Sequence, residues 1–103
     1  MTTLILEVDP IAIDVTVTDQ KLIVNLEDGR SITIPLAWYP RLWHGTPAER
    51  QNYQLLGDGY AIEWADLDEH IGVEGLIAGR RSSESEQSLA RWLATRDNQG
   101  ELS

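Results

Sequence analysis

The sequence predicts an α+β protein, with a three-strand antiparallel meander plus a further strand, covered by short helices, and a C-terminal amphipathic helix. Three observations predict this class: apolar and polar residues alternate along successive segments, turn residues separate them, and helix-start signals follow. The 103 residues suit a single domain with one core. Within it we expect an N-terminal segment at 1–10, a core at 11–79, a C-terminal helix region at 80–96 and a frayed tail at 97–103.

The first two strands are expected to form a hairpin. Apolar residues occupy every second position from residue 11 to residue 17, and residues 22, 24 and 26 repeat the pattern. A loop centred on residues 19–20 would bring the apolar residues of both strands to one face. The pairs that it predicts are Val17 with Leu22, Val15 with Val24, and Ile13 with Leu26.

A glycine decides the turn of the second hairpin. A two-residue turn at Asp28 and Gly29 would set polar residues against the apolar face of the preceding strand. A three-residue loop at 27–29, with Gly29 left-handed in a bulge, restores the apolar face. It predicts that Val24 pairs with Ile32 and Leu22 with Ile34.

Short helices follow the meander. Thr46, Pro47 and Glu49 supply an N-cap, a proline at the first helical position and a capping-box acid, which together predict a helix over about 47–53. Ahead of it, residues 36–44 are expected to form a helical turn interrupted by Pro40.

The later elements have their own signals. Alternation over residues 60–64 predicts the further strand, and a short helix over about 73–78 is expected to stop at Gly79. Ser83 and Glu86 read as a second capping box, which predicts a terminal helix ending near Arg96. Its apolar stripe comprises Leu89, Trp92 and Leu93.

Composition excludes several classes of function. The chain has no cysteine, which removes disulfide and thiol chemistry. Its formal net charge of −9 opposes contact with a nucleic-acid backbone. Neither a signal peptide nor an apolar run of transmembrane length is present. We therefore expect a cytoplasmic protein that binds no nucleic acid directly and no membrane.

The acidic run at 66–70 is the one place where a metal ion could be held. Hard oxygen ligands suit divalent cations, and the candidates are Asp66, Asp68, Glu69 and His70. The spacing matches no calcium loop, and the other interpretation is that these acids face the positive end of the short helix that follows. No catalytic set, phosphate loop or dinucleotide fingerprint is present, so we predict a protein that is not an enzyme and has no cofactor.

Two apolar segments could contact a partner. Aromatic residues and arginine are enriched at binding hot spots, and one segment contains Trp38, Tyr39, Arg41 and Trp43. These side chains could instead close the open face of the sheet, although we expect the last three to reach outward. The terminal stripe at 89–93 must also be covered, either by its own sheet, by a second copy in a homodimer, or by another protein.

Three blocks carry a family resemblance that runs from about residue 11 to residue 92. Residues 35–42 (PLAWYPRL), 46–50 (TPAER) and 64–76 (WADLDEHIGVEGL) resemble the bacterial domain family of unknown function numbered twenty-four forty-two. The resemblance implies a partner, because members are often encoded beside a second small protein in a toxin–antitoxin-like arrangement. Some members carry a following helix-turn-helix domain, for which this chain has no room after Trp92.

The residues and the resemblance together predict a non-catalytic protein-binding module with an antitoxin-like or regulatory role. Its expected partner is another small protein or a second copy of the chain. The alternative is a metal- or small-ligand-sensing domain that uses the acidic region at 63–74.

Overall fold

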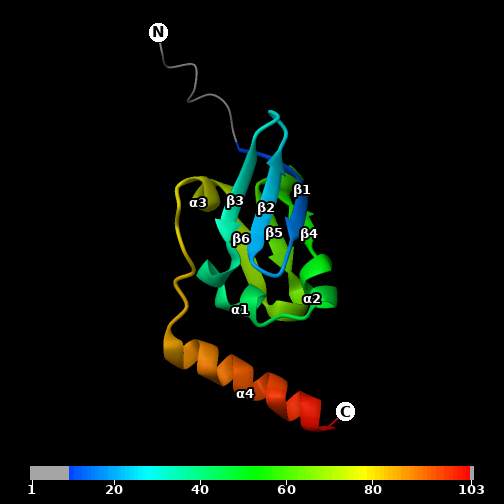
Figure 1. Cartoon of the computed structure of the whole chain (residues 1–103), viewed down its shortest axis with the longest axis vertical. Helices are drawn as coiled ribbons and strands as arrows, with labels where there is room; N and C mark the ends of the chain where they lie inside the picture. The colour runs from blue at the N-terminus through cyan, green and yellow to red at the C-terminus, as the bar shows by residue number, and fades with distance from the viewer. Residues whose placement is uncertain (1–9, 103) are drawn as a thin grey trace.

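The computed structural model describes the chain from Pro10 to Leu102, with side chains described as far as Arg96. All but the last residue of the expected N-terminal segment therefore lies outside the described residues. The described strands form two three-stranded antiparallel sheets, ordered β1-β2-β3 and β4-β5-β6 (Figure 1). Their bounds are β1 (Ala12–Val17), β2 (Lys21–Leu26), β3 (Ser31–Pro35), β4 (Gln54–Leu56), β5 (Ala61–Trp64) and β6 (Glu69–Gly72).

Short helices connect the strands, and one long helix follows them. The 3-10 turns are η2 (Leu36–Trp38), η3 (Gly57–Gly59) and η4 (Ala65–Leu67). The α-helices are α1 (Pro40–Trp43), α2 (Pro47–Gln51), α3 (Val73–Ile77) and α4 (Glu86–Leu102). We call residues 10–79 the two-sheet body and residues 80–85 the linker. In Figure 1 the linker descends beside the two-sheet body, and α4 lies across the end of the body that carries α1 and α2.

The first hairpin matches the predicted register at two of three pairs. Val17 lies opposite Leu22 and Val15 opposite Val24, but the residue opposite Leu26 is Ala12. The prediction for Ile13 is wrong, because a β-bulge between residues 12 and 14 inserts an extra residue there. Ile13 is consequently 58% exposed.

The second hairpin has the predicted three-residue loop. Val24 pairs with Ile32 and Leu22 with Ile34. The Leu26 N–H donates to the Arg30 carbonyl at 2.8 Å, and the Gly29 N–H donates to the Leu26 carbonyl at 3.1 Å. Gly29 has φ +94°, so the left-handed bulge residue is confirmed.

The second sheet is larger than expected. The further strand predicted at 60–64 is β5, but β4 and β6 were not predicted, because each has only three or four residues and little alternation of apolar and polar residues. Glu69 and His70 belong to β6, and the N-cap of α3 is Gly72. The other interpretation of the acidic run, that it faces the start of the helix that follows, is therefore wrong for these residues.

The helix signals near the middle of the chain are confirmed. The Glu49 N–H donates to the Thr46 hydroxyl at 3.1 Å, and the Thr46 N–H donates to the Glu49 carboxylate at 2.9 Å, which completes the capping box of α2. Pro40 starts α1 after the 3-10 turn, and α3 is followed by Gly79 with φ +79°.

The cap of the terminal helix lies two residues after the predicted one. The hydroxyl of Ser85, not that of Ser83, accepts the Ser88 N–H at 3.0 Å. The predicted capping box between Ser83 and Glu86 is therefore wrong. The helix also continues to Leu102, so its predicted end near Arg96 is wrong.

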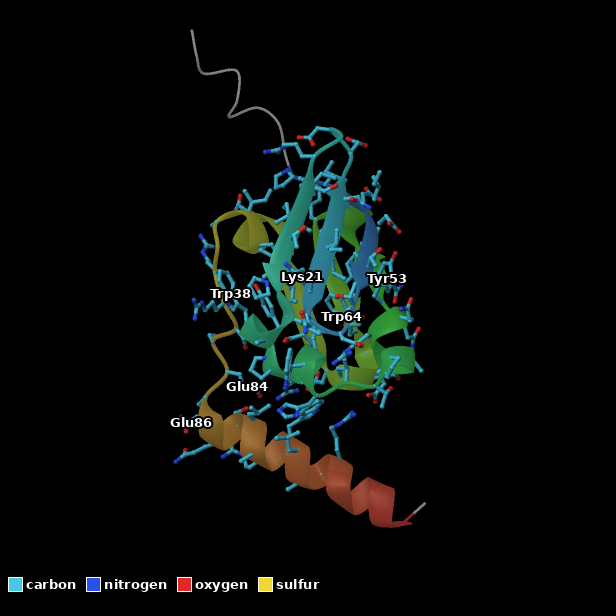
Figure 2. All side chains as sticks on the ribbon, viewed as in Figure 1. Lys21, Trp38, Tyr53, Trp64, Glu84 and Glu86 are labelled. Atoms are coloured by element: carbon cyan, nitrogen blue, oxygen red, sulfur yellow. The ribbon has the colours of Figure 1, made fainter. Side chains whose placement is uncertain are left out.

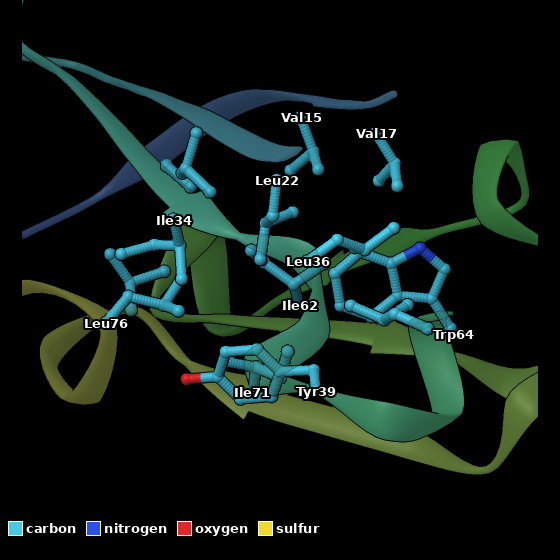
Figure 3. Packing of buried hydrophobic residues seen from close by; sticks show 14 of the residues in the cluster. Val15, Val17, Leu22, Ile34, Leu36, Tyr39, Ile62, Trp64, Ile71 and Leu76 are labelled. Carbon is cyan, nitrogen blue, oxygen red and sulfur yellow. The ribbon is translucent and has the colours of Figure 1, made fainter. Parts of the chain in front are cut away.

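The core lies between the two sheets. Figure 3 shows Val15, Val17 and Leu22 of the first sheet facing the second sheet, with Leu36 between them. Trp64 of β5 is fully buried, and its indole N–H donates to the Arg50 carbonyl at 3.0 Å. The polar atom of this ring is thereby satisfied inside the core.

Candidate functional site

The aromatic segment that the sequence singled out divides between core and surface. Trp38 is half-buried, and Trp43 is 45% exposed on the end of α1. The expectation that Tyr39 reaches outward is wrong: its side chain is 5% exposed, and its hydroxyl donates to the Arg80 carbonyl at 2.6 Å. The turn between η2 and α1 directs this ring into the core, where burial raises the pKa of the phenol with a smaller contribution from Glu69.

The linker is held against this segment. The Ser82 N–H donates to the Trp38 carbonyl at 3.1 Å. The guanidinium of Arg81 lies 4.4 Å from the centroid of the Trp38 ring, which is a cation–π contact. The linker of the same chain therefore covers part of the Trp38 ring, which lies beside the linker in Figure 2.

Beyond the linker, α4 meets the two-sheet body at what we call the Trp92 cluster, formed by Arg41, Glu49, Glu84, Trp92 and Arg96. Arg41 donates to both oxygens of Glu84, at 2.9 Å from Nε and 2.5 Å from Nη2. Arg96 donates to both oxygens of Glu49, at 3.0 and 2.7 Å. Two guanidinium groups also contact the Trp92 ring, at 5.0 Å for Arg41 and 4.8 Å for Arg96.

The charges of the Trp92 cluster perturb one another. The hydrogen bonds from Arg96 are the main cause that lowers the pKa of Glu49 to about 2. The hydrogen bonds from Arg41 lower the pKa of Glu84 in the same way. Since Glu49 also completes the cap of α2, one carboxylate joins the start of α2 to α4. These pairs stay ionised through the neutral range.

The predicted apolar stripe of α4 is only partly used by this contact. Leu89, Trp92 and Leu93 are all half-buried, and Trp92 alone of the three packs against the core. The structure thus shows α4 docked on its own body. A role of the two leucines in binding a partner remains a prediction.

The candidate metal ligands are not brought together. Asp66 accepts a hydrogen bond from the Asn52 side chain at 2.9 Å, and Asp68, with its side chain 91% exposed, contacts Arg41 at 3.2 Å. Glu69 is half-buried, whereas His70 is exposed. Within the part of the chain that the structure describes, no three His, Asp or Glu residues are grouped to hold a metal ion.

The sequence analysis did not predict the charge pairs of the Trp92 cluster. It named Glu49 only as the capping-box acid of α2, and it assigned no partner to Glu84 or Arg96. They pair with residues 43 and 47 positions away. Charged residues of either sign occur along the whole chain, and nothing in their local sequence marks which will meet. The structure was needed to find them.

The comparisons with known proteins agree on the fold and assign no activity. The model of the family described as "Protein of unknown function (DUF2442)" matches residues 12–82. A crystal structure of a protein of unknown function from Rhodospirillum rubrum is 25% identical, covers 75% of this chain and 95% of its own, and superposes with a TM-score of 0.65. A solution structure of an uncharacterised protein from Chromobacterium violaceum is 19% identical, with 84% and 75% covered and a TM-score of 0.61, and shows the fold alone.

No curated protein matches the chain. None of the helices in the described residues is both long and apolar enough to span a membrane.

Proposed function

The chain belongs to the family DUF2442, whose description assigns no function, and we propose that it is a non-catalytic protein-binding module whose partner is another small protein or a second copy of the chain. The antitoxin-like or regulatory role in this proposal rests on the family resemblance. The surface that we assign to partner binding consists of Trp43 together with Leu89 and Leu93 of α4.

The observation that carries the proposal is the exposure of Trp43. An indole ring that remains 45% exposed leaves a large apolar area in water, and tryptophan is among the residues most enriched at binding hot spots. The ring is also presented on a well-held backbone. The neighbouring Leu42 is fully buried, and Arg50 donates to the carbonyls of Leu42 at 2.9 Å and of Trp43 at 2.7 Å. A pre-organised anchor loses little conformational entropy when it binds.

The position of α4 supports the same proposal. The family match ends at residue 82, so α4 lies outside the matched region. Leu89 and Leu93 give this helix apolar area that the core does not use. An amphipathic helix with such residues is a common element of contacts between chains.

Light scattering on the purified chain tests self-association. We expect a dimer that dissociates on dilution from about 1 mM, a concentration at which association worth about 4 kcal/mol is visible. Trp43→Ala and the double change Leu89→Ala/Leu93→Ala should shift the mass toward the monomer. Ile77→Ala is the matched control, because Ile77 is also exposed but lies on α3.

Purification of the native chain from its own cells tests whether the partner is another small protein. A stoichiometric second protein that is lost with Trp43→Ala and kept with Ile77→Ala would support binding through this surface. A chain that stays monomeric at all concentrations, and that brings no such protein with it, contradicts the proposal.

A further inference from the structure

Two adjoining hollows, of about 210 and 280 Å³, lie between β6 and the linker. Glu69, Ser82 and Ser83 line both, and we call the combined space the Glu69 cavity. Tyr39 and Gly72 border the first hollow, and the Arg41–Glu84 pair borders the second. Each hollow is smaller than the roughly 300–1,000 Å³ typical of sites for drug-sized ligands. Either hollow taken singly therefore suits a group of side-chain size.

Among the described residues, Glu69 forms no ion pair. It pairs across the second sheet with the buried Trp64, so it is on the core side of β6 at the edge of the cavity. One carboxylate oxygen accepts the N–H of His70 at 3.2 Å, and this is the one hydrogen bond that the carboxylate makes within the described residues. The guanidinium of Arg41, whose charge acts on Glu69, is paired with Glu84 and Asp68.

The Glu69 carboxylate accepts few hydrogen bonds among the described residues, although donors line the cavity. Burial is the main cause that raises its pKa, and the charges of Glu84 and Asp68 add to this effect; the His70 N–H and Arg41 oppose it. The hydroxyl of Ser82 already accepts the Glu84 N–H, and that of Ser83 makes no hydrogen bond within the described residues. The Glu69 cavity is thus lined by a half-buried carboxylate and two serine hydroxyl oxygens, which can accept hydrogen bonds from a ligand.

We propose that the Glu69 cavity binds an organic cation through a primary ammonium group. An ammonium group brings three donors and a positive charge, which suits a carboxylate flanked by two serine hydroxyls. An inorganic anion is disfavoured because it would face Glu69. At the rim, Arg80 and Arg81 also border the first hollow and would meet any carboxylate that the same ligand carries.

Two sources could supply this group: a free alkylamine or the lysine side chain of a polypeptide. Butylammonium represents the first and Nα-acetyl-lysine amide the second. Tetramethylammonium is the matched control, because it carries the same charge without an N–H donor. Tighter binding of acetyl-lysine amide would identify a polypeptide source, and tighter binding of butylammonium a free amine.

The test is an NMR titration of the full chain, which follows the backbone amides of Gly72, Ser82 and Ser83. We expect saturable shifts at these amides with both ammonium probes and none with tetramethylammonium. Glu69→Gln should weaken binding about tenfold or more, because a charge-assisted hydrogen bond is lost. Glu63→Gln removes the same charge from the adjacent strand β5 and should leave binding unchanged.

A second variant guards against an effect on folding. Gly72 lines the first hollow, a Cβ at this position meets no atom within 4 Å, and its backbone φ is −77°, so Gly72→Leu adds a bulky apolar group at the hollow without backbone strain or change of charge. It should also abolish the shifts while the rest of the spectrum is kept.

Binding should weaken as the pH falls through the raised pKa of Glu69, since the protonated carboxyl loses its charge. Other charged or titratable side chains also line the Glu69 cavity and contribute to the pH dependence of binding. They are Arg41 of α1, Asp68, His70 of β6, Arg80, Arg81 and Glu84.

Absence of saturable shifts with both probes would overturn the inference, as would equal binding by Glu69→Gln. The inference does not depend on the proposed protein-binding function. A chain that stays monomeric, brings no second protein with it and still binds butylammonium would keep the inference and refute the proposed function, because mass, co-purification and amide shifts are separate measurements.

Discussion

The two-sheet body and α4 are held in place by different forces. Every residue of the buried core belongs to the two-sheet body, between Ala12 and Leu76. By contrast, α4 has no fully buried side chain among those described. It is attached through the Arg96–Glu49 pair and the half-buried ring of Trp92, and the linker just before it is attached through the Arg41–Glu84 pair. The first region depends on apolar burial and the second mainly on charge.

This difference indicates where stability resides. Full burial of a large apolar side chain contributes about 1.5–3 kcal/mol, whereas an exposed ion pair contributes about 0–1 kcal/mol. The family match also covers the two-sheet body and leaves out α4. We therefore expect the two-sheet body to fold without α4, and α4 to respond to salt and pH. The predictions that follow test this contrast from the largest effect to the smallest.

Two tryptophans allow the most direct comparison. Trp64→Ala should lower the free energy of unfolding by about 3–5 kcal/mol, because it removes a fully buried ring and leaves the Arg50 carbonyl without its donor. Trp92→Ala should cost about 1–2 kcal/mol, because that ring is half-buried and is contacted by two guanidinium groups. Urea denaturation measures both. Equal costs would mean that α4 belongs to the core.

Gly59 tests how tightly the two-sheet body is packed. A Cβ at this position would lie 2.4 Å from the Ala12 carbonyl oxygen, and its φ of +105° disfavours any side chain. Gly59→Ala should therefore cost about 3 kcal/mol. Gly72→Ala, which meets no atom within 4 Å, is the control and should cost far less in the same urea titration.

Truncation after Gly79 tests whether the two-sheet body stands alone. It removes the Trp92 contact and the hydrogen bonds that Arg80 and Ser82 make with residues 38–39. We expect circular dichroism to retain the strand signal and thermal or urea unfolding to show a loss of about 2 kcal/mol. Complete unfolding of the truncated chain would show that α4 is integral to the fold. No change in stability would show that it is a solvated appendage.

The second hairpin offers a backbone effect at a distance from α4. Gly29→Val should destabilise the protein by about 1–2 kcal/mol, because a β-branched residue resists the left-handed conformation that the bulge requires. Open space surrounds the position, so no clash contributes. A cost within about 0.5 kcal/mol of wild type, as for ordinary surface changes, would contradict this account of the turn.

The smallest expected effect comes from the charge pairs. Because Arg96 lowers the pKa of Glu49 from 4.5 to about 2, the stability from this pair is complete above about pH 4.5 and is lost as the pH falls through 2. For a surface pair we expect about 1 kcal/mol, reduced further by salt. Arg96→Gln should return the pKa of Glu49 toward 4.5, as NMR titration of its carboxyl carbon would show. An unchanged pKa would contradict the pairing.

Much of the first sheet could be predicted because its signals are local. Alternation of apolar residues fixed two hairpins, and Gly29 selected the loop that keeps their apolar faces aligned. Thr46 with Glu49 marked the start of α2 for the same reason, since a cap involves residues three positions apart. The exception is Ile13, where a bulge breaks the two-residue period that the prediction assumed.

The candidate sites were less predictable. The sequence drew attention to Trp43 and Trp92, but it assigned Tyr39 to the surface, and only the fold shows that this ring fills the core. Glu69 appeared in the sequence as one of several acids. Only the structure shows that Glu69 lies in a cavity between β6 and the linker and forms no ion pair among the described residues.

The sequence by itself determined the α+β class, the meander and most helix starts, because periodicity and capping act over a few residues. The tertiary structure alone decided that β4 and β6 complete a second sheet, that Arg41 meets Glu84, and that Arg96 meets Glu49. The paired residues of β4, β5 and β6 are 5 to 11 positions apart, whereas the partners in the charge pairs are more than forty positions apart. Such partners are selected by which surfaces the packed core leaves adjacent, and no local pattern of residues records that choice.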